Sequence, residues 1–250
     1  MDRLLVATLN ILNLADRWHE RLPLILADMA ALQPDLLGLQ EVVYPMQQDR
    51  LIGAAGEGHY QAVRGWAGRP EYGNSMLVKE PLAFGAYERL DLGILRSAHR
   101  VIVPLPSGAR LLFAVTHLHH PPAATEERRA QVAQLVPWLD TSPAHDAMIV
   151  VGDFNADPEE PAYAGMVAGG FRSAYRVANG AEPAVTWPSG LQAPAMDTDG
   201  IPRTARLPSG FAGRSRVEDA RLAFSRPDRR TRRCIPRTTS ASRPTCGWGA

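Results

Sequence analysis

Short apolar runs separated by polar breaks organise the first 200 residues of the chain. The runs are apolar and partly β-branched, which predicts buried strands. They occupy residues 4–9, 36–39, 74–79, 101–105, 111–116 and 147–151. The segment PSGAR, between the fourth and fifth of these runs, is a hairpin signal.

Two other segments have the spacing of helices. In the first, apolar residues recur at Leu22, Ile25, Met29 and Leu32, and Pro23 is compatible with a position near the start of a helix. Residues 125–139 form a second, amphipathic pattern that leads into the strand at 147. Strands interspersed with helices and a hairpin indicate an α/β protein with mixed sheets.

Polar residues stand at the ends of four predicted strands. They are Asn10, Glu41, His117 and Asp153, with Asn155 just beyond Asp153. Each alone has a structural explanation, because polar residues at strand ends often cap loops. Strand ends of a layered α/β fold converge on one rim, however, so these side chains are expected to form one pocket. Carboxylate and amide oxygens suit Mg²⁺ or Mn²⁺ better than zinc.

The stretch AMIVVGDFNADPEE (residues 147–160) shows this pattern most sharply. An apolar strand breaks at Gly152, and alternation then places Asp153 and Asn155 on one side of the chain and Phe154 on the other. Two short polar groups presented together suit a cation, a water or a phosphate. The alternative is an Asx-turn, in which these side chains cap their own backbone.

Six segments of the chain, spanning about residues 4–190, carry a family resemblance. LVATLNILN, QPDLLGLQEV, YGNSMLV, AVTHLHH, VVGDFNADP and VTWPS resemble, in order, motifs of the endonuclease/exonuclease/phosphatase superfamily. That superfamily includes DNase I-like nucleases, apurinic endonucleases, sphingomyelinases and inositol polyphosphate phosphatases. The resemblance implies a four-layer α/β sandwich, with two mixed β-sheets packed face to face and helices outside. It also implies hydrolysis of phosphate esters with Mg²⁺, or Mn²⁺ as an alternative.

The resemblance also implies roles for individual residues. Glu41 would be the principal metal ligand, with Asn10 beside it. Asp153 would orient or activate the attacking water, and Asn155 would contact phosphate oxygens. His117 would donate to the phosphoryl group as negative charge grows there.

Four further polar residues are also considered for a place in or near the site. Asn74 resembles a residue that helps to hold the site and is expected to bind substrate. Arg100 is expected either at the same rim or in solvent, and His119 and His120 are expected to be loop residues.

Charge divides the chain into an acidic body and a basic tail. Residues 201–250 hold twelve of the 27 basic residues and three of the 26 acidic ones, so their net charge is +9, against −8 for residues 1–200. The tail also lacks the Asp-His pair with which the family ends, since no histidine follows His145. We therefore expect a catalytic domain over residues 1–200 and an aberrant Arg-rich segment of the same domain over 201–250, with the C-terminal strands disrupted.

One hypothesis is that the tail is translated in a shifted reading frame, which would explain its many arginines and its missing family motif. RCIPRTTSASRPTCGWG (residues 233–249) can begin with the codons CGC TGT ATC CCT CGG ACC ACC TCG GCC TCG. Read one base earlier, these bases encode Thr-Leu-Tyr-Pro-Ser-Asp-His-Leu-Gly-Leu, the expected family ending. Residues 201–215 are interpreted as a similar slip, with residues 216–224 back in frame as a strand. Resequencing the codons for residues 198–234 decides the matter.

The alternative function belongs to a different class. With a genuine tail, the chain would be an inactive module that binds a cation at the body and a polyanion through its arginines. The acidic body argues mildly against a nuclease for duplex DNA, so a small phosphate ester is preferred over nucleic acid as substrate.

Composition adds few further limits. A 45% hydrophobic and 21% charged chain is typical of a soluble globular protein, and no apolar run suggests a membrane partner. The N-terminus lacks a small-residue cleavage site, and two cysteines imply no disulfide framework. We expect a cytoplasmic monomer.

Overall fold

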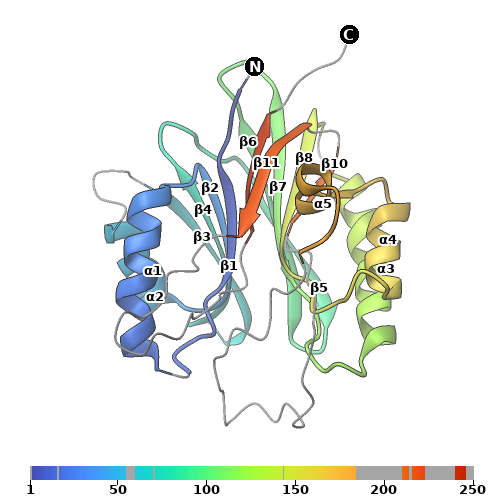
Figure 1. The fold of residues 1–250 in the computed structure, drawn as a ribbon, viewed down its shortest axis with the longest axis horizontal. Helices are drawn as coiled ribbons and strands as arrows, with labels where there is room; N and C mark the ends of the chain where they lie inside the picture. The colour runs from blue at the N-terminus through green and yellow to red at the C-terminus, as the bar shows by residue number, and fades with distance from the viewer. Residues whose placement is uncertain are drawn as a thin grey trace.

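Two six-stranded β-sheets pack face to face, and helices cover their outer surfaces (Figure 1). This arrangement, seen in a computed structural model, confirms the predicted α/β fold with two mixed sheets. The structure describes residues 2–15, 17–54, 60–69, 71–142, 144–183, 210–213, 216–222 and 240–245.

The first sheet has the strand order β11-β12-β1-β2-β4-β3. β1 and β2 are parallel, whereas β2 pairs with β4 and β4 with β3 in antiparallel fashion. The helices α1 (Trp18–Leu32) and α2 (Tyr44–Ala54) lie on its outer side (Figure 1). The strands are β1 (Val6–Asn10), β2 (Leu36–Val43), β3 (Tyr60–Arg69), β4 (Tyr72–Lys79), β11 (Arg216–Leu222) and β12 (Ser240–Thr245).

The second sheet has the strand order β5-β6-β7-β8-β10-β9 and repeats the plan of the first. Its central pair, β7 and β8, is parallel, and the neighbouring strands are antiparallel. The helices α3 (Thr125–Asp140) and α4 (Pro161–Ala168) cover its outer face, and α5 (Ala174–Asn179) follows β9. The strands are β5 (Tyr87–Gly93), β6 (Arg96–Pro104), β7 (Arg110–His117), β8 (Ala147–Asp153), β9 (Arg172–Ser173) and β10 (Gly210–Gly213).

The apolar runs of the sequence form the layer between the two sheets. Val115 and Val151 of the second sheet, for example, are buried in the same cluster as Val6 and Leu36 of the first. A methyl group on Gly38 of β2 would come within 2.5 Å of Val151 Cγ2, so a side chain there would push the sheets apart. Burial on both faces explains why the central strands read as continuous apolar runs.

All six predicted strands and both predicted helices are present, and most are longer than predicted. The PSGAR hairpin is confirmed by the bond from Gly108 N to Leu105 O, 2.9 Å long, between β6 and β7. The sequence patterns did not reveal α2, β3, β5, α4 or α5. No helix in the described part of the chain is long and apolar enough to cross a membrane.

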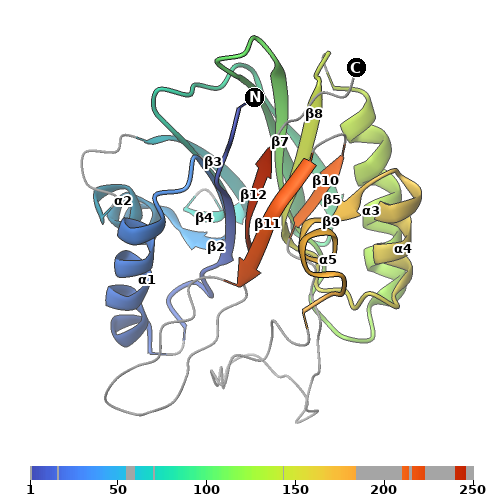
Figure 2. The ribbon, with the colours of Figure 1, turned by 45° about the horizontal axis from the view of Figure 1, so that its top comes forward.

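The tail contributes backbone to both sheets. β11 confirms the strand predicted over residues 216–224, and β10 pairs with β8 although it lies in the segment interpreted as a slip. Residues 240–245 form a strand, β12, that lies between β11 and β1 (Figure 2). The sequence of this inner strand, SASRPT, includes Pro244, a residue that cannot donate a ladder hydrogen bond.

Candidate active site

A local irregularity of β2 presents Glu41 to the site. The pairing of β2 with β4 shifts between Leu39 and Val42, and Glu41 has a left-handed φ of 57°. Such strain persists where the surroundings hold it and is common at functional sites. The Glu41 carboxylate accepts hydrogen bonds of 2.9 Å from the side-chain amides of both Asn10 and Asn13.

Asn10 connects the two sheets at this point. Its Nδ2 donates to Glu41 Oε1 at 2.9 Å and to Asp153 Oδ2 at 2.8 Å, so the carboxylates of β2 and β8 flank one amide group. Its Oδ1 accepts from Leu12 N at 2.9 Å. Asn10, Glu41 and Asp153, predicted from separate strand ends, are therefore in one hydrogen-bonded group.

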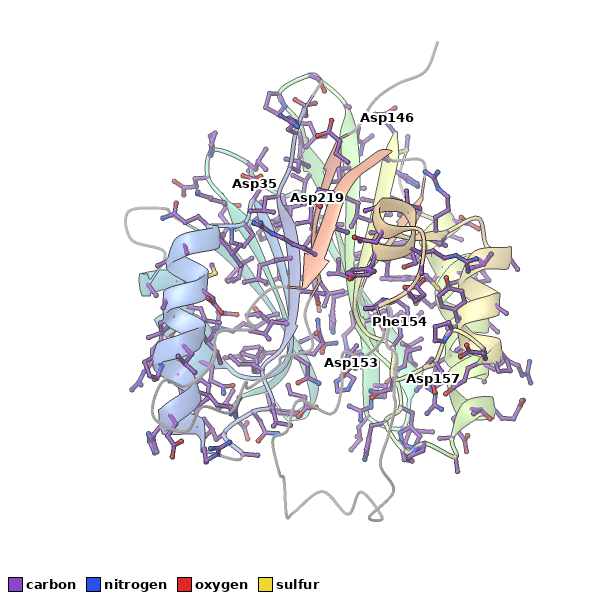
Figure 3. The ribbon with its side chains drawn as sticks, in the orientation of Figure 1. Asp35, Asp146, Asp153, Phe154, Asp157 and Asp219 are labelled. Carbon is purple, nitrogen blue, oxygen red and sulfur yellow. The ribbon has the colours of Figure 1, made fainter. Side chains whose placement is uncertain are left out.

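Asp153 forms the predicted Asx-turn and also belongs to the hydrogen-bonded group. Its Oδ1 accepts from Asn155 N at 3.1 Å, which is the Asx-turn, while Oδ2 faces Asn10. Phe154 points the other way, into the cluster beneath α3 and α4, as alternation predicts (Figure 3). Burial raises the pKa of the Asp153 carboxyl; the hydrogen bond from Asn10 opposes this shift, and the charge of Glu41 adds to it.

The side chain of Asn155 is turned partly toward the protein. Asn155 has a left-handed φ of 50°, and its Nδ2 donates to Leu118 O at 3.1 Å. This bond ties the end of β8 to the segment that follows β7. Asn155 thus lies beside Asp153, and its side-chain amide fixes the loop.

His117 lies at the end of β7, directly opposite Asp153 in the parallel pairing of β7 and β8. Its Nδ1 is 3.3 Å from Arg96 NH1. Because a guanidinium can only donate, Nδ1 is the acceptor and the ring proton is on Nε2. Nε2 is buried and has no partner among the described residues. Burial lowers the pKa of His117 well below its ordinary value, and Arg96 lowers it further, so the ring is a neutral donor at neutral pH.

One pocket brings Glu41 and His117 together, whereas Asn10, Asp153 and Asn155 are not among its lining residues. It is lined by Glu41, Tyr72, Gly73, Asn74, Leu95, Arg96, Ser97 and His117. Asn74, predicted to bind substrate, lines the pocket, but its Nδ2 donates to Ser97 O at 3.2 Å across the sheet interface. Its amide therefore holds β4 against β6 in this structure.

Buried side chains hold the loop that carries Asn13. Arg21 of α1 donates to the carbonyls of Ile11, at 2.7 Å, and Ala15, at 2.5 Å, and is stacked over Trp18 at 5.5 Å. Gln47 of α2 donates to Asn13 O at 2.5 Å. Two helices thus fix the backbone from which Asn13 reaches Glu41.

Sequence reasoning missed three members of the site. Arg96 supplies the positive charge, Asn13 binds Glu41, and Tyr72 lines the pocket together with Glu41. Only Asn13 had a usable signal, because it repeats the polar position of Asn10 three residues later.

The expectation for Arg100 was wrong in both of its forms. Arg100 is buried beneath α3, where it pairs with Glu88 at 2.6 Å and stacks on Trp138 at 4.2 Å. His119 and His120 lie in the loop after β7, as expected, and His120 Nδ1 accepts from Arg96 NH2 at 2.9 Å.

Known proteins share both the sequence motifs and the fold of this chain. The sequence profile of the endonuclease/exonuclease/phosphatase family matches residues 7–247. A search of curated proteins finds no match.

Several solved structures share the fold. The human Nocturnin catalytic domain with bound sulfate is similar with a TM-score of 0.77 and 23% identity, over 97% of this chain and 94% of that one. An endonuclease/exonuclease/phosphatase from Bacteroides vulgatus has a TM-score of 0.77 and 16% identity, over 98% and 99% of the two chains. D. rerio TDP2, complexed with a single-strand DNA product, has a TM-score of 0.75 and 16% identity, over 98% and 100%.

Proposed function

Because this chain belongs to the endonuclease/exonuclease/phosphatase family, whose members are generally hydrolases of phosphoesters, we propose that it hydrolyses a phosphate ester with the help of a divalent cation. The observation that carries the proposal is the Asn10 amide held between the carboxylates of Glu41 and Asp153. Of these groups, Glu41 meets a neutral histidine and an arginine at one pocket.

The donor set fits a hard cation such as Mg²⁺. Mg²⁺ is usually bound by one or two carboxylates and keeps several waters, and Glu41 and Asp153 supply two. No cluster of three acidic, histidine or cysteine side chains is present among the described residues, so waters would have to complete the coordination of a bound cation. Burial and, to a smaller extent, the charge of Glu41 raise the pKa of Asp153, and a cation would offset the charge of the two carboxylates. When bound, such a cation lowers the pKa of a water and offsets phosphate charge.

The chain's own residues would then divide the work. Asp153, whose pKa is shifted upward, is suited to accept a proton from a water and to orient it. His117 would donate its Nε2–H to a phosphoryl oxygen as charge develops there. Arg96 holds the histidine in this tautomer and adds a fixed positive charge.

The small-molecule preference and the cytoplasmic, monomeric state remain proposals based on sequence. The substrate class can be tested by offering the protein single-stranded DNA, a lipid phosphodiester and small phosphate esters in parallel, with Mg²⁺. The proposal predicts turnover that is fastest on the small esters. Tight binding of polyanions without turnover of any substrate would favour the inactive binding module instead.

A further inference from the structure

The turn between β5 and β6 has an unusual combination of sequence and backbone. Its two central residues, Ile94 and Leu95, have left-handed φ values of 51° and 54°. Two-residue hairpin turns with both φ values positive are normally built from Asn and Gly, because other side chains clash with their own backbone there. A β-branched residue in this region is a genuine outlier.

These two side chains also point away from the apolar core. Leu95 is 75% exposed and Ile94 is 55% exposed, which makes them the most exposed large apolar residues in the described part of the chain. The turn therefore has two costs, backbone strain and apolar exposure, without a packing benefit within the molecule. Strain of this kind is concentrated at ligand-binding sites.

The turn belongs to the candidate active site by position. Leu95 lines the pocket together with Glu41, Arg96 and His117. Arg96, the next residue, pairs with Gly93 across the hairpin and contacts His117. An apolar side chain at the pocket mouth thus adjoins the groups suited to a phosphate.

The base of the hairpin is firmly held, so the turn is a fixed wall of the pocket. Leu92 is buried, and its carbonyl accepts from Gln131 Nε2 of α3 at 3.4 Å. Gln131 Oε1 in turn accepts from His119 N at 2.9 Å. These bonds connect the hairpin, the helix and the loop that carries His120.

We propose that Leu95, with Ile94 beside it in the turn, forms an apolar subsite that selects phosphate esters whose organic group is large and apolar over those whose organic group is small. This inference rests on the proposed function, because the phosphate is placed at Arg96 and His117. Burial of the ester's apolar group against Leu95 would offset the exposure of the turn.

Two non-hydrolysable probes with the same headgroup test the subsite. Naphthylmethylphosphonate and methylphosphonate are titrated calorimetrically into the whole protein with Mg²⁺ present. Wild type is expected to bind the naphthylmethyl compound roughly tenfold more tightly, the size of effect that one apolar contact gives. Leu95→Asn and Ile94→Asn should reduce this preference while leaving the affinity for methylphosphonate unchanged.

The same variants carry an independent readout of folding. Asn tolerates left-handed φ, so each variant should melt at the same temperature as wild type or up to about 4 °C higher. Weaker binding with equal or greater stability separates the subsite from a structural role. Val167→Asn, at an exposed apolar position on α4, is the matched control and should keep the preference.

The outcomes separate the two proposals. Equal affinity of wild type for both probes, or an unchanged preference in Leu95→Asn, would overturn the apolar subsite alone. Failure of wild type to bind either phosphonate would instead reject the phosphate site, and the subsite with it.

Discussion

The two strands that flank β1 differ in kind. On one side β2 pairs with β1 through five residue pairs, and on the other β12 pairs through two. β2 reads LLGLQEVV and supplies Glu41, whereas β12 reads SASRPT, a sequence of low strand propensity. Figure 2 shows both beside β1 in one sheet.

This difference shows that a strand can fill a place in the sheet without contributing known site residues. The backbone edge of β1 offers hydrogen-bonding groups to any extended segment, so a sequence of low strand propensity can occupy the place next to it. The candidate site needs particular side chains, and its described members all come from residues 10–155. We propose that the body carries the chemistry while the tail completes the sheet at lower stability.

Restoring the reading frame of the tail should have the largest effect on both activity and stability. In a variant with Thr-Leu-Tyr-Pro-Ser-Asp-His-Leu-Gly-Leu in place of residues 233–242, Mg²⁺-dependent turnover should rise by about 10²–10⁴, the range of an added general base. The thermal midpoint should rise too, because apolar residues would replace polar ones in the strand. A second variant with Ala at the new histidine should gain the stability without the rate. Equal values for all three proteins would show that the Arg-rich tail belongs to a working enzyme.

Glu41→Gln should weaken the metal site of the body, residues 1–200. The substitution keeps the shape and removes one negative charge, so Mg²⁺ affinity should fall by more than the roughly 10–100-fold typical of changes next to a metal ligand. Mg²⁺ titrations that follow turnover and thermal shift measure this loss. Glu88→Gln, at an acidic residue on β5 that pairs with Arg100, is the control and should leave the Mg²⁺ response intact. Indistinguishable titrations of Glu41→Gln and wild type would remove Glu41 from the metal site.

Arg21→Met should disturb the site from a distance. The variant removes the donors to the carbonyls of Ile11 and Ala15, which costs about 1–3 kcal/mol of stability for each carbonyl left buried without a partner. Asn13 should then hold Glu41 less firmly, and turnover should fall together with stability in urea unfolding. Arg17→Met removes a surface ion pair with Glu20 and should have little effect. A variant that loses stability but keeps the full rate would show that this loop does not position the site.

Acid should destabilise the body through its buried histidines. Burial lowers the pKa of His99 to about 3 and also lowers that of His117, so both stay neutral when folded but gain a proton when unfolded below their ordinary value of 6.5. The stability they contribute is full above that value and should fall by about 1.4 kcal/mol per pH unit for each histidine as the pH drops below it. Urea unfolding between pH 7 and about 5 measures the slope, which His117→Gln should make shallower. An unchanged slope would mean that His117 is already protonated in the folded protein.

The site residues that lie at the ends of strands could be predicted from the sequence. Asn10, Glu41, His117 and Asp153 each end an apolar run, and runs of this kind converge wherever the strands are packed in layers. Arg96 was missed because it begins a strand, β6, whose start the apolar pattern placed at 101. Its partner His117 is 21 residues away, and local pattern carries no information about such a contact.

The same limit applies to elements whose packing decides their structure. The exposed and half-buried residues of β5 give no clear alternation, and the apolar residues of α2 (YPMQQDRLIGA) are interrupted by the polar run QQDR. Arg100 was misjudged because an arginine is rarely buried, and only the tertiary contacts with Glu88 and Trp138 make its burial favourable. The bulge that gives Glu41 its left-handed backbone likewise has no signature in the sequence.

We propose that the two ends of β8 differ in function, because catalysis depends on Asp153 and not on Asp146 (Figure 3). Asp146 precedes the strand and accepts from Arg110 N, so Asp146→Asn is a matched control for Asp153→Asn. The direct measurement is hydrolysis of bis(p-nitrophenyl) phosphate by wild type and both variants across a Mg²⁺ titration. We expect slow, Mg²⁺-dependent turnover that falls by about 10²–10⁴ in Asp153→Asn and persists in Asp146→Asn. Turnover that is independent of Mg²⁺, or equal in Asp153→Asn and wild type, would contradict the claim.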